Sequence, residues 1–323
     1  MATRGWGYWT EAKLDILSAY LPAFAKASTR AGSIVYLDLF AGNDKNQRRD
    51  TGVDINGSAV RALDALPDRA RLYLFELPKV AVALETRLRD QYPGRDFTVV
   101  PGDSNESLPG VLDQIRSGGL VWAPTFVFID PYTSSNLQWD TLRRLADFKR
   151  APKYKVELWL LFFGSNIPRV LGQRTSRNAD QVSRTFGCDD WKPIALARDE
   201  RLIDAPRARY EYTNLMRWRL EHELDYDRTH TLEIKNTKGV YLYDLIFATD
   251  NRAGDRIMSD VYRAALDRNE RMRIEAAELG RERQSGAGTL FDAAELASLT
   301  PPPAVAYEHL LPTPPFTIDR DNV

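Results

Sequence analysis

Short apolar runs alternate with helical patterns along the first half of the chain. Each run is an uninterrupted stretch of mainly hydrophobic residues, which is typical of a strand buried on both faces of a sheet. Between the runs, apolar residues recur at three- and four-residue spacings, which predicts amphipathic helices. Such an alternation requires a parallel sheet with right-handed crossovers. The predicted strands span 33–40, 71–76, 97–100, 125–129 and 156–163.

A hairpin pattern follows in the second half of the chain. Strand-like segments at 229–235 and 240–248 flank a turn at 236–239 that contains Asn and Gly. We therefore predict an α/β fold with a Rossmann-like sheet. This sheet is mostly parallel, has a late antiparallel hairpin, and is flanked by helices on both faces.

The same pattern divides the chain into parts. In the first part, Thr10 is the expected N-cap of a helix and Lys13 is expected to be exposed. The last part is rich in proline, cannot form much core, and is expected to be draped over the domain or disordered. The expected parts are an N-terminal helix at 1–30, a sheet domain at 31–250 with an insertion at about 164–228, a C-terminal helix at 251–283 and a tail at 284–323.

Composition narrows the possible functions. The formal net charge of −1 excludes a polycation that coats nucleic acid, although it leaves room for a local basic patch. Cys188 is the single cysteine, and the three histidines lack ligand spacing, so we expect neither a disulfide nor a metal site. The chain begins without a signal-peptide pattern and has no apolar run long enough to span a bilayer, so we expect a cytoplasmic protein.

Acidic residues stand at or just after four successive predicted strands. An acid at the second strand end can accept both hydroxyls of a ribose, and one after the third strand can accept from the adenine amine. The loop that follows the first predicted strand, which we call the first loop, lacks the three-glycine spacing of a pyrophosphate site. This favours S-adenosylmethionine over NAD. A single acid at a strand end can be explained as the N-cap of the next helix. Acids at the ends of four successive strands favour a cofactor site. The predicted cofactor site comprises Asp38, Phe40, Ala41, Gly42, Glu76, Leu77, Asp103, Ser104 and Asp130.

The turn Asp130, Pro131, Tyr132 follows the fourth strand, where an acceptor would meet the methyl group. The carboxylate and backbone carbonyls can accept hydrogen bonds from an amine, and an aromatic ring can stack on a base. We predict that these three residues form the catalytic site. The alternative is that Pro131 only stops the strand and Tyr132 packs over the sheet edge.

Two basic segments are candidates for contacts with nucleic acid. One lies in the first loop and the other follows the fifth strand, so both belong to the side where an acceptor must enter. The alternative is a solvated surface balanced by neighbouring acids. The candidate residues are Lys45, Arg48, Arg49, Arg169, Arg174 and Arg177.

In combination, several of these segments resemble a known family. The chain is similar to class I S-adenosylmethionine-dependent methyltransferases and, more closely, to the three-Cys-motif partner protein family. The similarity covers Trp9 to about residue 283 and excludes the proline-rich end. It is carried by 13–17, 36–42, Gly57-Ser58, 130–132, Phe186-Gly187 with Trp191, and 243–249 with Asn251 and Gly254.

This resemblance implies a Rossmann-like methyltransferase domain, with S-adenosylmethionine as the cofactor. It also implies a bacterial or phage-associated protein whose partner is a cysteine-motif protein. The turn at 130–132 is similar to the Asp/Asn-Pro-Pro-Tyr/Phe signature of amino methyltransferases, but it has one proline where that signature has two.

The functional hypothesis is an enzyme, a methyltransferase that acts on an amino group of a nucleic-acid base, in DNA or RNA, with a protein partner. One alternative is a catalytically weak nucleotide-binding subunit that assembles with a cysteine-motif protein. Another is a methyltransferase for a small molecule or a protein side chain. The sequence does not set the oligomeric state.

Overall fold

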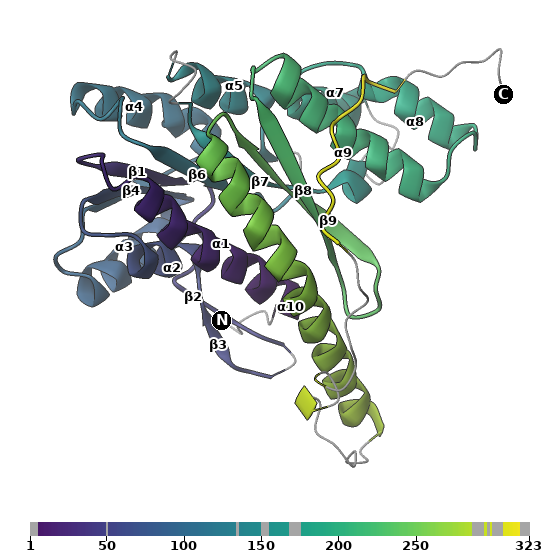
Figure 1. The fold of residues 1–323 in the computed structure, drawn as a ribbon, viewed down its shortest axis with the longest axis horizontal. Coiled ribbons are helices and arrows are strands. Elements are labelled where there is room, and N and C mark those ends of the chain that lie inside the picture. Colours follow the sequence, from purple (N-terminus) through teal and green to yellow (C-terminus); the bar gives the residue numbers. More distant parts are fainter. Residues whose placement is uncertain are drawn as a thin grey trace.

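A seven-stranded sheet forms the centre of the protein (Figure 1). The computed structural model describes residues 6–49, 51–133, 136–149, 155–167, 176–285, 294–295, 298 and 306–316. The strands lie in the order β5-β4-β1-β6-β7-β9-β8. Their bounds are β1 Ile34–Asp38, β4 Ala70–Glu76, β5 Phe97–Pro101, β6 Thr125–Ile129, β7 Glu157–Phe162, β8 Arg228–Lys235 and β9 Tyr241–Thr249.

Strand directions confirm the predicted fold class. Neighbours from β5 to β7 pair in parallel, whereas β9 pairs antiparallel with both β7 and β8. The parallel strands therefore all end at one edge of the sheet, which we call the carboxyl edge. Because β9 runs in the opposite direction, its first residues also lie at this edge, where Asp244 pairs with Phe162 at the end of β7.

Helices cover both faces of the sheet. Two large hydrophobic clusters lie on opposite faces, because successive side chains of a strand point to opposite sides. The first face carries α1 (Tyr8–Ala27), α2 (Ser58–Ala65), α3 (Pro78–Gln91) and α10 (Arg252–Ser285). The second carries α4 (Ser104–Ser117), α5 (Trp139–Asp147), α7 (Ser176–Phe186), α8 (Trp191–Asp199) and α9 (Ala205–His222), with a short 3-10 turn η3 (Gly164–Asn166) after β7.

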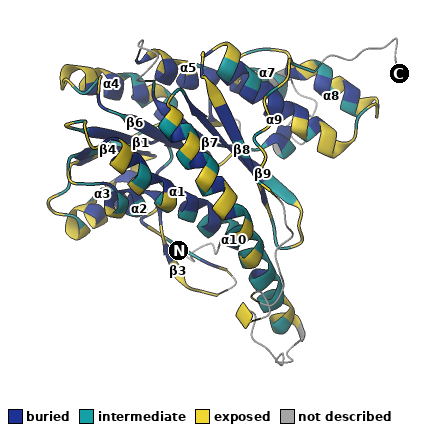
Figure 2. Ribbon diagram, viewed as in Figure 1, coloured by how far each residue is buried: buried dark blue, intermediate teal, exposed yellow. Residues whose placement is uncertain are grey.

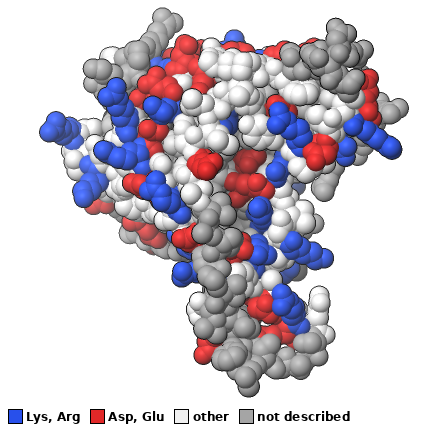
Figure 3. All heavy atoms as spheres, turned by 45° about the vertical axis from the view of Figure 1, so that its right-hand side comes forward, with Lys and Arg blue, Asp and Glu red and all other residues white. Residues whose placement is uncertain are grey.

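Burial follows these layers closely. Every residue of β1, β6 and β7 is buried, which explains why their sequences are mainly apolar (Figure 2). On the face shown in Figure 3, side chains of both charge signs are interspersed, in keeping with the nearly balanced charge of the chain. None of the helices in the described ranges is long and apolar enough to cross a membrane.

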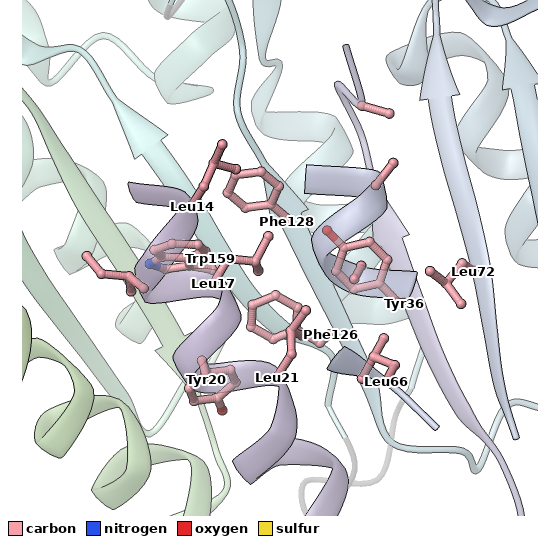
Figure 4. Close-up of a cluster of buried hydrophobic side chains, with 14 of the residues drawn as sticks. Leu14, Leu17, Tyr20, Leu21, Tyr36, Leu66, Leu72, Phe126, Phe128 and Trp159 are labelled. Carbon is pink, nitrogen blue, oxygen red and sulfur yellow. The ribbon is translucent and has the colours of Figure 1, made fainter. Parts of the chain in front are cut away.

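Aromatic and leucine side chains together form the cluster beneath α1 (Figure 4). The ring of Phe126 lies 5.2 Å from the ring of Tyr20 and 6.2 Å from that of Tyr36, measured between centroids. The rings of Phe128 and Trp159 are likewise 5.2 Å apart. Helix α1 is thus fixed across the middle of the sheet.

The first loop contains a small hairpin that the sequence did not predict. Strands β2 (Lys45–Gln47) and β3 (Asp54–Asn56) pair antiparallel within it. Near this hairpin, Arg48 forms an ion pair with Glu11 of α1, with 2.9 Å between Nη1 and Oε2. The loop is therefore attached to the N-terminal helix.

Two local expectations for α1 are wrong. The helix begins at Tyr8 after Gly7, so Thr10 lies inside it and does not cap it. Lys13 is not exposed: only 8% of its side chain is accessible. The reason is that Lys13 belongs to the buried stripe of the helix, which also contains Ile16, Leu17 and Tyr20.

We expect Phe126→Ala to lower the free energy of unfolding by about 3–5 kcal/mol, because it removes a fully buried ring from the α1 cluster. Chemical denaturation measures this loss, and Phe126→Leu should cost clearly less. A loss below about 1 kcal/mol for the alanine variant would show that this cluster does not hold the fold.

Candidate active site

The carboxyl edge brings together three of the four predicted acids. Asp38 ends β1, Glu76 ends β4, and Asp130 follows β6 directly. Their charges act on common neighbours. The charge of Asp130 contributes to the raised pKa of Asp38, and the charges of Glu76 and Asp130 add to the effect of burial in raising the pKa of Tyr132.

Glu76 holds the turn after β1. One of its oxygens accepts the backbone N–H of Gly42 at 2.7 Å, and the other accepts the N–H of Leu77 at 2.8 Å. A carboxylate offers about four acceptor positions, so about two are unused by the residues that the structure describes, although Glu76 is largely buried. Gly42 has a φ of 64°, a conformation that favours glycine, and the space where its Cβ would stand is open. The backbone can therefore approach a ligand at this point.

Asp38 lies inside the fold. It is fully buried and accepts hydrogen bonds from the backbone N–H of Phe40 at 3.2 Å and from the Tyr36 hydroxyl at 3.3 Å. Burial raises the pKa of Asp38 to about 7, against the opposing effects of the Ser58 hydroxyl and the Phe40 amide. Its contacts fix the turn that carries Phe40, Ala41 and Gly42.

Asp130 forms an ion pair with Lys13 of α1. The Lys13 ammonium contacts Oδ2 of Asp130 and lies 5.9 Å from the centre of the Phe128 ring. About a quarter of the Asp130 side chain remains accessible. The pair places one oxygen of Asp130 against a cation and holds the start of α1 over the end of β6.

Sequence reasoning missed Lys13, although the signal was present. Lys13 stands three and four residues before Ile16 and Leu17, on the apolar face of an amphipathic helix. A lysine is almost never fully buried unless it is paired. A lysine on a buried face therefore predicts an anionic partner, although not which one.

The other two residues of the turn at 130–132 differ in how far they are exposed. Pro131 is buried, whereas Tyr132 is 66% exposed, next to Asp130. The tyrosine ring therefore presents most of its surface to solvent at the carboxyl edge, where it is free to meet a planar partner.

Asp103 is the N-cap of helix α4, as the alternative interpretation of the strand-end acids predicts. It is exposed, and its carboxylate accepts from the backbone N–H and the side-chain amide of Asn105, each at 2.9 Å. Ser104 is buried in the first turn of α4, whereas Leu77 is exposed and Phe40 is half-buried. Asn105 also donates to the carbonyl of Asn136 at 2.8 Å, which ties α4 to the loop after Tyr132.

The predicted basic residues do not form one surface in the described part of the chain. Lys45 and Arg49 are exposed, but Arg48 is buried in its contact with Glu11. Arg169 and Arg174 lie outside the described residues, as does the side chain of Arg177 in α7. Among the residues that the structure describes, no cluster of His, Cys, Asp and Glu could hold a metal ion.

No known family model matches the chain, and no curated protein matches it either. The resemblance to the three-Cys-motif partner family therefore stays a prediction. Several solved structures are similar. A Legionella pneumophila protein of the DUF519 family is 11% identical with a TM-score of 0.44, over 78% of this chain and 87% of that one.

Two methyltransferase structures are also similar. The precorrin-6y C5,15-methyltransferase of Geobacter metallireducens is 12% identical, with a TM-score of 0.34 over 72% of this chain and 86% of that one. Fibrillarin of Aeropyrum pernix, solved with natively bound S-adenosyl-L-methionine, is 13% identical, with a TM-score of 0.34 over 72% and 76%. Such distant likenesses carry no functional assignment. The fold class rests on the strand order of the sheet, which is Rossmann-like.

We expect Asp38→Asn to flatten the dependence of stability on pH. The folded-state pKa of Asp38, about 7, lies above its ordinary value of 3.8, so the folded protein retains a proton that the unfolded chain releases. Stability contributed by this group is therefore greatest below pH 3.8 and is lost as the pH rises to about 7.

Denaturation between pH 4 and pH 8 measures this effect, which amounts to at most about 4 kcal/mol. The difference in unfolding free energy between the wild type and Asp38→Asn should shift in favour of the variant across this range. A constant difference would mean that the buried carboxyl does not titrate in this window.

Proposed function

We propose that the chain is an S-adenosylmethionine-dependent methyltransferase whose cofactor lies over the turn after β1, between Glu76 and Asp130. The main support is the geometry of Glu76: it fixes the amide of a left-handed glycine and keeps acceptor positions for a ribose. The open space beside Gly42 gives a ligand room to approach. These residues fit a nucleoside better than a dinucleotide, because the turn has no phosphate cradle.

The proposed acceptor is an amino group of a nucleic-acid base. Within the described ranges, Lys13 is the only donor in contact with Asp130, and it contacts Oδ2. Oδ1 is then left to accept from an amine, and the exposed ring of Tyr132 can stack on a base, a contact worth about 1–3 kcal/mol.

When bound, S-adenosylmethionine supplies a methyl group already activated by its sulfonium, so the protein mainly provides alignment. Asp130 orients the acceptor nitrogen and offsets the positive charge that develops on it. Lys13 fixes the orientation of Asp130, while Tyr132 holds the plane of the base. No general base is needed when the nitrogen loses its proton to water after transfer.

Cofactor binding tests the first part of the proposal. We expect isothermal titration to show saturable binding of S-adenosylmethionine, weakened about 10- to 100-fold in Glu76→Gln, because a charged acceptor of ribose hydroxyls is lost. Glu85→Gln, which changes an acid on the outer face of α3, is the matched control and should bind normally.

Unaltered affinity in Glu76→Gln would remove Glu76 from the cofactor site. Absence of saturable binding by the wild type would reject the enzyme altogether and favour the alternative of an assembly subunit for a cysteine-motif protein.

Transfer of a tritiated methyl group to DNA, tRNA and rRNA tests the acceptor. We expect label in nucleic acid, with the rate reduced about 100-fold or more in Asp130→Asn, because the carboxylate acts on charge that develops in the transition state. Tyr132→Ala should mainly raise KM, and Tyr132→Phe should restore it, because stacking needs the ring and not the hydroxyl. Label found solely in protein or small solutes would reject the base and favour the other methyltransferase alternatives.

A further inference from the structure

Residues 306–316 of the tail cross the edge strand β8 and contact both layers of helices. Tyr307 packs against the hydrophobic cluster of the α1 and α10 face, and its ring meets that of Tyr262 at 5.6 Å. Phe316 packs against the cluster on the opposite face. In Figure 1 this segment, in yellow, runs beside β8 and α9. An aromatic residue near each end therefore anchors the segment around the open edge of the sheet.

Helix α9 contacts the main chain of this segment. The side-chain amide of Asn214 donates to the carbonyl of Thr313 at 3.0 Å, and the N–H of Thr313 donates to Oδ1 of Asn214 at 2.9 Å. The guanidinium of Arg217 donates to the carbonyl of Leu310. Such contacts recognise an extended backbone and depend little on the side chains of the peptide.

Strand β8 supplies the second side of the groove. Nε2 of His230 lies 2.6 Å from a carboxylate oxygen of Asp255, which can only accept, so this nitrogen carries the proton. Nδ1 of His230 therefore accepts from the hydroxyl of Tyr307 at 2.8 Å. His309 donates to the carbonyl of Thr229 at 2.7 Å. The groove thus selects an aromatic hydroxyl at one end and main chain at the other.

The segment gains little from burying its own central side chains. Leu310 and Leu311 are 53% and 65% exposed. Prolines at 312, 314 and 315 restrict the chain to extended conformations, which lowers the entropy lost on binding. These properties are typical of a peptide ligand and not of a core element.

We propose that the groove formed by Asn214, Arg217, Thr229 and His230 is a binding site for an extended, proline-containing peptide, and that the chain's own tail occupies it as a tethered ligand. The partner that this groove fits is a protein segment of the same chemistry: a tyrosine, then an extended stretch with a free N–H, followed by prolines.

Displacement of the tail has a structural consequence. A cavity of about 680 Å³ lies beneath it, lined by Arg209, Asp244 and Tyr307 among others. Asp244 stands at the carboxyl edge of the sheet, beside the end of β7. A partner that replaces the tail therefore opens or reshapes this cavity, which lies on the same edge of the sheet as the candidate active site.

The tail is covalently attached, so its effective concentration at the groove is on the order of millimolar. A peptide added in solution must compete with it. The test therefore uses the full-length chain with its own tail weakened by Tyr307→Ala and His309→Ala, and a fluorescently labelled peptide with the sequence of residues 306–316. Fluorescence anisotropy reports binding.

We expect saturable binding of the peptide to this double variant, and binding at least about tenfold weaker to the wild type because the tethered tail competes. A peptide with Thr313→Pro lacks the N–H that Asn214 accepts and should bind much more weakly. Adding Asn214→Ala to the double variant should have the same effect on the unaltered peptide. Circular dichroism confirms that each variant is folded.

A folded double variant that does not bind the peptide would overturn the proposal, as would equal affinity for the Thr313→Pro peptide. Self-association of the wild type that disappears in the double variant would overturn it in favour of a second copy as the occupant. None of these outcomes depends on methyl transfer, so they are independent of the proposed enzymatic function.

Discussion

The contact between Glu76 and Gly42 is the interaction on which the candidate site depends. It joins the end of β4 to the turn after β1 and sets the shape of that turn from outside it. Parallel pairing of β1 with both β4 and β6 places the strand ends that carry the three acids next to one another. The sheet therefore positions the residues of the proposed nucleoside site, and the carboxylate of Glu76 fixes the turn beside them.

A second constraint comes from α1. Its aromatic contacts hold it across the sheet, and its buried lysine binds the acid that follows β6. An ammonium in this position costs solvation, which only a close anion and hydrogen bonds can offset. The ion pair between Lys13 and Asp130 thus fixes the N-terminal helix and the turn at 130–132 relative to each other.

The sequence predicted the sheet well because its central strands β1, β6 and β7 are buried on both faces, and continuous burial leaves a mainly apolar sequence. It could not predict the hairpin of β2 and β3, whose short strands carry polar residues such as Lys45 and Asp54 and bury little. It placed Asp38 at the edge of the sheet correctly, but a strand end does not reveal the burial of the side chain or its contacts with Tyr36 and Phe40. For Asp103, cofactor contact and helix cap have the same sequence pattern; the structure shows the cap, and the cofactor contact stays a prediction.

The histidines show a further limit. His230 and His309 are distant in sequence and have no ligand spacing, yet their rings lie 4.2 Å apart. Their rings meet because the tail crosses the edge strand β8, and no local sequence pattern predicts this path.

Because β9 runs against its neighbours, α10 starts at the far edge of the sheet, where Gly254 lies against Glu157. It then runs back beside α1 and continues past the sheet, until Arg283 donates to the carbonyl of Arg49 in the first loop. The helix thus contacts β7 near its first residues and the loop after β1 near its last ones. The last turns of α10 and the loop after β1 therefore hold each other in place, although 234 positions separate Arg49 from Arg283 in the sequence.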